Sequence, residues 1–276
     1  MHLQENRPIH RGTVTSTDGT VLSYQRLGHG APLVVCHGSF ATAQDWLPFA
    51  ERMARTRTVF LYDRRGRGDS PAAPDFAIDA ELDDLAAMID LAGPEGALLG
   101  HSFGGGCALA LAARIGFPGP LIVYEPRHSA RGPVSRGHIP DIRRMLAAGD
   151  LDGATEFALA HVVGLPAPAL AGLRSGPLWE RFRQTIGAFP NELRLLDDLA
   201  WQPGDLDGIA GPCTLLTGGN SPVPPDASSP DMALRTLLPA IRARTIPDQG
   251  HFAYSAAPAL LADSVDACLT GRTVPA

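Results

Sequence analysis

The sequence contains no lysine, and all 23 of its basic residues are arginine. This absence excludes the chemistries that depend on a side-chain primary amine. Schiff-base catalysis, pyridoxal-phosphate enzymes, phosphate-loop nucleotide sites and serine–lysine pairs all need a lysine. Any reaction that the protein catalyses must therefore use hydroxyl, imidazole, carboxylate or backbone groups.

Cysteine and positive charge are also scarce. The four cysteines, Cys36, Cys107, Cys213 and Cys268, show no metal-ligand or redox spacing, and three lie inside apolar runs. We therefore expect free, buried thiols and a reducing, cytoplasmic location. The formal net charge of −6 argues against nucleic acid as a partner, because a nucleic-acid surface needs clustered positive charge.

Long apolar segments are absent as well. Residues 1–12 are polar and lack the apolar centre of a signal peptide, and no stretch approaches the ~18 apolar residues of a membrane span. No cluster of ligating side chains indicates a metal ion or an organic cofactor, so we expect neither. The expected partner is a small-molecule substrate and not a membrane, and a homodimer is left open.

Short apolar runs that are typical of buried strands alternate with helical patterns along most of the 276 residues. Residues 13–26 in addition read as a hairpin around Asp18-Gly19. This alternation predicts an α/β fold with a parallel sheet. The alternation of strand and helix patterns stops after Pro126, and the following segment shows helical patterns only. We therefore predict a core formed by residues 1–126 and 202–276, interrupted by a helical cap at 127–201.

The segment Gly100-His101-Ser102-Phe103-Gly104 forms a G-x-S-x-G pentapeptide. It follows an apolar strand and opens a helix that is rich in small residues. This context is typical of a nucleophile elbow, in which a serine occupies a strained turn between strand and helix. The helix N-terminus then favours negative charge that develops at the serine. Ser102 is the predicted nucleophile.

A serine nucleophile needs a base, and the chain order serine, acid, histidine places this base after the last strand. Of the nine histidines only His251, in the turn Asp248–Phe252, meets that condition, and His101 is expected to point elsewhere. The third member must accept a hydrogen bond from the imidazole. Glu125 at the end of the 121–124 strand is our preferred candidate, and Asp226 in a Pro/Ser-rich loop is the alternative.

Two backbone N–H groups should stabilise the oxyanion. They are predicted to belong to Phe103, which follows the nucleophile, and to Ser39 in the loop His37-Gly38-Ser39-Phe40, with Phe40 as a second choice. The arginine-rich segment 63–70 is expected to be a tight turn that supports the elbow through Arg–Asp hydrogen bonds, without a catalytic role.

Together, the 37–40 loop, the 63–70 segment, the G-H-S-F-G-G elbow and Gly250-His251 resemble the α/β-hydrolase superfamily. The resemblance implies a mostly parallel eight-stranded sheet flanked by helices, with a helical cap before the seventh strand. In some branches of the superfamily the acid of the triad follows the sixth strand, as Glu125 would. The serine at position 221, where an aspartate would be expected, agrees with that assignment.

These features predict a serine hydrolase that cleaves a carboxylic ester or lactone through an acyl-enzyme. Carbon–carbon bond hydrolysis, cofactor-free perhydrolysis and a non-hydrolytic, ligand-binding role are the alternatives. Most cap aromatics are expected to be core, with Phe40, Trp179 and Phe182 as candidate pocket residues. Arg127, His128 and Arg131, which begin the cap, are expected to be solvated, with contact to an anionic substrate group as the alternative.

Overall fold

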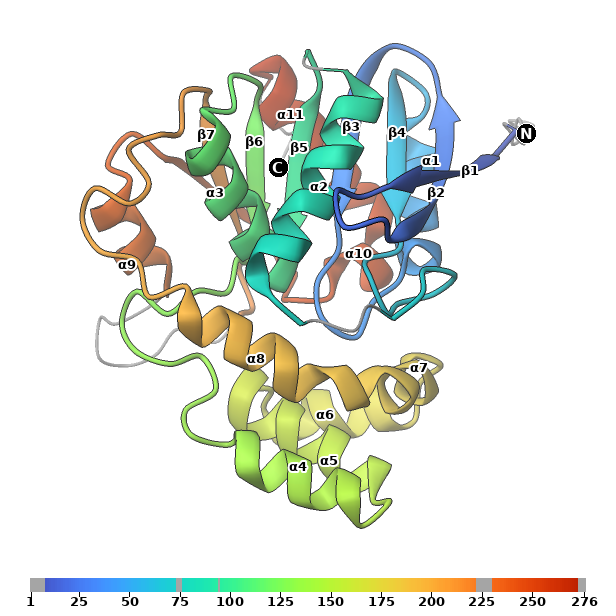
Figure 1. Ribbon diagram of the computed structural model, residues 1–276, viewed down its shortest axis with the longest axis vertical. Coiled ribbons are helices and arrows are strands. Elements are labelled where there is room, and N and C mark those ends of the chain that lie inside the picture. Colours follow the sequence, from blue (N-terminus) through green and yellow to red (C-terminus); the bar gives the residue numbers. More distant parts are fainter. Residues whose placement is uncertain (1–7, 73–75, 94, 222–229, 273–276) are drawn as a thin grey trace.

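The computed structural model describes residues 8–72, 76–93, 95–221 and 230–272. Its centre is an eight-stranded sheet in the order β1-β2-β4-β3-β5-β6-β7-β8, shown in Figure 1. The strands are β1 (His10–Thr15), β2 (Val21–Gly28), β3 (Ala31–Cys36), β4 (Arg57–Tyr62), β5 (Ala97–His101), β6 (Leu121–Tyr124), β7 (Cys213–Gly218) and β8 (Arg242–Ile246). The predicted α/β fold with a mostly parallel eight-stranded sheet is confirmed.

In the order of the sheet, the strands β4, β3, β5, β6, β7 and β8 run parallel to one another. The strand β2 is antiparallel to both of its neighbours, β1 and β4. The parallel strands coincide with the continuous apolar runs because helices cover both faces of the sheet. Within β3, for example, Val34 packs into one core, and Leu33 and Val35 pack into the other. The Asp18-Gly19 turn joins β1 and β2 as predicted.

Two groups of helices form these cores. The core on one face includes side chains from α2 (Ile78–Ala92), α3 (Phe103–Ile115) and α9 (Pro230–Leu237). The core on the other face includes side chains from α1 (Leu47–Met53), α10 (Ala253–Ala256) and α11 (Pro258–Thr270). The apolar stripes of these helices were readable in the sequence, except for the four-residue α10, which is too short to show a period.

A separate helical layer lies across one end of the sheet (Figure 1). It consists of α4 (Ile139–Ala147), α5 (Leu151–Phe157), which continues as a π-helical segment (Ala158–Val163), α6 (Ala167–Arg174), α7 (Leu178–Thr185) and α8 (Phe189–Asp198). A third apolar core holds these helices together and includes Phe40 from the sheet side. All of them fall within the segment predicted to be the cap, whose boundaries at 127 and 201 stay predictions. In the described part of the chain, no helix has the length and apolarity that a membrane crossing requires.

Candidate active site

Ser102 lies at the sharp turn between β5 and α3, with φ 53° and ψ −117°. A non-glycine residue in this region carries about 1–3 kcal/mol of strain, which persists only where the surroundings hold it. Here the Ser102 N–H donates to the Tyr124 carbonyl at 3.1 Å, and its own carbonyl accepts from the Arg127 N–H at 3.0 Å. The turn is therefore fixed from both sides by the β6 strand and the segment that follows it.

The glycines around Ser102 allow neighbouring backbone to come close. A Cβ at Gly104 would lie 2.3 Å from the Cys36 carbonyl oxygen, and one at Gly38 would lie 2.8 Å from the Ser102 Cβ. Both distances are shorter than real side chains allow. Glycine at these two positions is what brings the 37–40 loop against the elbow.

The residues predicted to form the oxyanion hole flank this contact. Ser39 follows Gly38 and lines the same pocket as Ser102, and Phe103 is the first residue of α3. The first N–H groups of a helix have no partner within the helix, so the Phe103 N–H is a ready donor. The role of both groups stays a prediction.

The imidazole of His251 faces a carboxylate. Its Nδ1 lies 2.7 Å from Oε2 of Glu125, and His251 and Ser102 line one pocket. Oε1 of Glu125 accepts hydrogen bonds from the Gly218 N–H at 2.8 Å and from the Ser221 hydroxyl. The serine at position 221 thus supports the carboxylate on β6. The alternative acid, Asp226, lies outside the described residues.

The protonation states of Glu125 and His251 are those that a serine–histidine mechanism requires. Burial raises the pKa of Glu125, but hydrogen bonds from His251, Ser221 and the Gly218 N–H, with the charge of His251, outweigh it and lower the pKa to about 2. Burial lowers the pKa of His251 below its ordinary value in spite of the carboxylate. At neutral pH the site therefore holds an ionised acid beside a neutral base.

Two residues for which no role was predicted hold the His251 turn in place. The Tyr124 hydroxyl donates to the Gly250 carbonyl, and Nε2 of His101 lies 2.9 Å from the His251 carbonyl. Because a carbonyl only accepts, His101 must carry its proton on Nε2. Burial keeps the pKa of His101 well below its ordinary value, so the ring is neutral. As expected, His101 points away from the pocket.

The pocket has an empty volume of about 390 Å³, part of it open to solvent. Its lining is Ser39, Phe40, Ser102, Arg127, Val134, Val162, Val163, Phe189, Leu193, Leu196, His251 and Phe252. Phe40 is thus a lining residue as predicted, but Trp179 and Phe182 are not. Phe182 is fully buried behind Phe40, with ring centroids 5.2 Å apart. Trp179 packs in the cap core and donates to Asp152 at 2.7 Å.

The expectation for the start of the cap is only partly right. Arg131 is exposed as predicted, but His128 is buried and stacks on Trp201 with centroids 5.5 Å apart. Arg127 is partly buried and lines the pocket. The peptide N–H of Arg127 binds the Ser102 carbonyl, and this bond keeps the start of the cap against the elbow.

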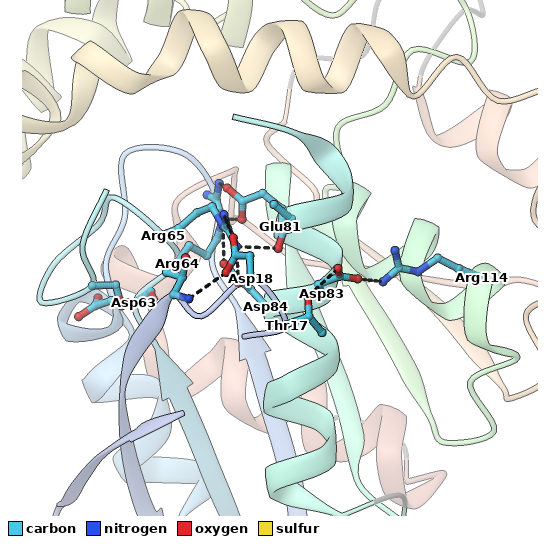
Figure 2. Close-up of polar contacts among 12 residues, drawn as sticks. Thr17, Asp18, Asp63, Arg64, Arg65, Glu81, Asp83, Asp84 and Arg114 are labelled. Carbon is cyan, nitrogen blue, oxygen red and sulfur yellow. Dashed lines mark hydrogen bonds and ion pairs between the residues drawn. The ribbon is translucent and has the colours of Figure 1, made fainter. Parts of the chain in front are cut away.

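The arginine-rich turn after β4 is braced in part by the predicted Arg–Asp hydrogen bonds, which Arg65 makes, and in part by pairs between arginine and glutamate. Arg64 forms a two-pronged pair with Glu81 of α2, at 2.8 and 3.0 Å, and reaches Glu192 of α8 at 2.9 Å. Figure 2 shows the Arg64–Glu81 pair together with that of Arg65 and Asp84. Arg64 thus pairs with carboxylates of two helices, whereas Arg65 pairs with Asp84 of α2 and with Asp18 in the β1–β2 turn, at 3.0 Å. Asp63 instead accepts from the backbone N–H groups of residues 43 and 69.

This buried network supports the elbow, as expected of the segment. The Arg64 guanidinium stacks on the ring of Phe103, 4.0 Å from its centroid. Arg64 and Glu192 are each only 1% exposed. Burial raises the pKa of Glu192, but Arg67 and Arg64 outweigh it and keep the pKa below its ordinary value. Through Arg64, the carboxylate of Glu192 on α8 is thereby linked to Phe103, the residue that follows Ser102.

The sheet order, the elbow and the Glu125–His251 pair define an α/β fold with a hydrolase-type site. A model of the alpha/beta hydrolase family matches residues 33–264, and the chain belongs to this family. A solved alpha/beta hydrolase from Sphaerobacter thermophilus is 31% identical, with a TM-score of 0.80 over 94% of this chain and 100% of that one.

Two curated relatives match most of the chain. The sn-1-specific diacylglycerol lipase ABHD11 of Mus musculus is 29% identical over 90% of this chain and 85% of its own length. A non-heme haloperoxidase of Rhodococcus erythropolis is 26% identical over 86% and 92%, respectively. The predicted superfamily is thus confirmed, and these relatives support a hydrolase.

Proposed function

We propose that the protein is a serine hydrolase that cleaves a small carboxylic ester or lactone through an acyl-enzyme. The observation that carries the proposal is the 2.7 Å contact between His251 Nδ1 and Glu125 in the pocket of a strained Ser102. With Nδ1 facing the carboxylate, Nε2 is the nitrogen available as a base. The name of the mouse lipase supports an ester as the substrate class.

In the proposed reaction Ser102 Oγ attacks the carbonyl carbon while Nε2 of His251 takes its proton. Glu125 orients the ring and stabilises the imidazolium, and the N–H groups of Ser39 and Phe103 hold the oxyanion. The alcohol leaves with the proton from His251, and the acyl group stays on Ser102. Water, activated by the same imidazole, then releases the acid and restores the hydroxyl.

Turnover of a chromogenic short-chain ester tests this mechanism. The wild type should hydrolyse 4-nitrophenyl acetate, and Ser102→Ala should reduce kcat by roughly 10⁴-fold or more. Circular dichroism and thermal unfolding should show a folded variant. Equal rates for the wild type and for folded Ser102→Ala would refute the nucleophile assignment.

Perhydrolysis is the second candidate, because one relative is named a haloperoxidase. It would use the same acyl-enzyme, with hydrogen peroxide replacing water as the acceptor and a peracid as the product. A panel of esters, lactones and 1,3-diketones, each with and without peroxide, separates these reactions from carbon–carbon hydrolysis. An ester-derived peracid that forms faster than the free acid would favour this second candidate.

A further inference from the structure

Arg127 is a charged side chain in an otherwise largely apolar pocket. Much of the lining around it is aliphatic or aromatic and includes Val134, Val162, Leu193 and Leu196. A cation in such surroundings is unfavourable unless an anion or several hydrogen bonds compensate it. The group that compensates the positive charge of Arg127 therefore indicates what kind of ligand the pocket binds.

The described residues supply little of that compensation. A guanidinium has five N–H donors, and among the residues that the structure describes that of Arg127 makes one long hydrogen bond, from Nη2 to the Val163 carbonyl at 3.3 Å. Within the described ranges, no carboxylate lies within 4.0 Å of it in an ion pair. The other pocket-lining basic group, His251, has its carboxylate partner at 2.7 Å.

The nearby negative charges do not fill this role. The Glu125 carboxylate is already engaged by His251, the Gly218 N–H and Ser221. Asp231 acts on Arg127 only at a distance, and burial with the neighbouring Glu125 charge raises the pKa of Asp231 to about 6. Burial lowers the pKa of Arg127 itself, which is the direction expected of a cation without a close counter-ion.

We propose that Arg127 binds a carboxylate of the substrate, so that the preferred substrate is a small ester or lactone that carries a free carboxylate. This inference rests on the proposed hydrolase function. A planar guanidinium pairs with a carboxylate through two parallel hydrogen bonds. One cation in an apolar lining matches one negative charge, and this favours a monocarboxylate over a phosphate dianion.

The position of Arg127 fixes where the carboxylate lies relative to the cleaved bond. The Arg127 N–H binds the Ser102 carbonyl at 3.0 Å, so nucleophile and anion site belong to adjacent backbone segments. The empty space of about 390 Å³ at this pocket includes open solvent, so the enclosed part suits a small substrate. Half-esters of short dicarboxylic acids are therefore suitable probes.

The test compares monoethyl succinate, glutarate and adipate with the corresponding neutral diethyl esters, using proton release to follow hydrolysis. The wild type should prefer a monoanion. Arg127→Met should lower kcat/KM for that monoanion by about 10–100-fold, mainly through KM, and should affect the neutral ester much less. Arg131→Met, at an exposed arginine of the same segment, is the matched control and should change neither substrate.

Binding to Ser102→Ala provides a readout that does not need turnover. Calorimetry should show monoethyl glutarate binding to Ser102→Ala and at least tenfold weaker binding to Ser102→Ala/Arg127→Met. Arg127-dependent binding without any ester turnover by the wild type would contradict the proposed function and support the anion site. An equal effect of Arg127→Met on charged and neutral esters, or binding that is independent of Arg127, would overturn the inference.

Discussion

Nδ1 of His251 lies 2.7 Å from Oε2 of Glu125, although 126 positions separate the two residues in the chain. Glu125 follows β6, so the carboxylate comes from the strand next to the one that carries Ser102. At the end of β7 a serine, Ser221, donates to this carboxylate. The segments that follow β6 and β7 together hold the Glu125 carboxylate in place.

Glu125→Gln should reduce kcat for ester hydrolysis by about 10²–10⁴-fold, because an amide is uncharged and stabilises the imidazolium poorly. Asp226→Asn is the matched control, and it should leave kcat within about twofold. Steady-state kinetics on one ester decide between the two acids. A larger loss in Asp226→Asn than in Glu125→Gln would overturn the assignment of Glu125.

The acid limb of the pH profile should lie below the ordinary range of a histidine. The base works only when it is neutral, and burial lowers the pKa of His251 below 6.5. Activity should therefore fall as the pH drops through this lowered pKa, at a lower pH than for an ordinary histidine. The acid limb of kcat/KM measures it. A midpoint above 6.5 would contradict the predicted direction.

Glu192→Leu should destabilise the fold strongly. The carboxylate is 1% exposed and pairs with Arg64 and Arg67, which would be left buried without it. Removing one partner of a buried pair costs about 3–5 kcal/mol in the free energy of unfolding. Denaturant unfolding measures this loss. Asp141→Asn breaks an exposed pair with Arg144 and should cost about 0–1 kcal/mol, so similar losses in both variants would refute the structural role of Glu192.

Gly38→Ala should impair catalysis more than stability. The added Cβ would lie 2.8 Å from the Cβ of Ser102, so the nucleophile or the 37–40 loop must move. A displacement of about 1 Å lowers rates by roughly 10²-fold. Gly187→Ala adds a Cβ with no heavy atom within 4 Å and should leave kcat unchanged. Kinetics of both variants test this, and an unaffected Gly38→Ala would argue against a tight elbow.

Local patterns were sufficient to predict the sheet and the elbow. Buried parallel strands appear as continuous apolar runs, and the Ser102 turn needs small residues at fixed offsets from the serine. The start of α6 is hard to locate from sequence, because prolines such as Pro166 and Pro168 commonly mark helix ends. Proline is tolerated in the first turn of a helix, and α6 begins at Ala167 between them.

The residues of the pocket were harder to predict, because contacts between distant segments of the chain determine which side chains line it. Trp179 and Phe182 have the helical spacing of both core and pocket residues, and only the position of Phe40 shows that Phe182 lies behind it. Arg127 looked like a surface residue in sequence. The bond from its N–H to the Ser102 carbonyl, which pairs residues 25 positions apart, brings it into the pocket.

The central claim is that Ser102 is a nucleophile activated by His251. A fluorophosphonate probe tests it directly, because attack by Ser102 Oγ forms an O–P bond and expels fluoride, while His251 takes the proton. Mass spectrometry of the intact protein and its peptides should show one adduct, on Ser102, that is absent in Ser102→Ala and much slower to form in His251→Ala. An unlabelled wild-type protein, or an adduct on any other residue, would contradict the account.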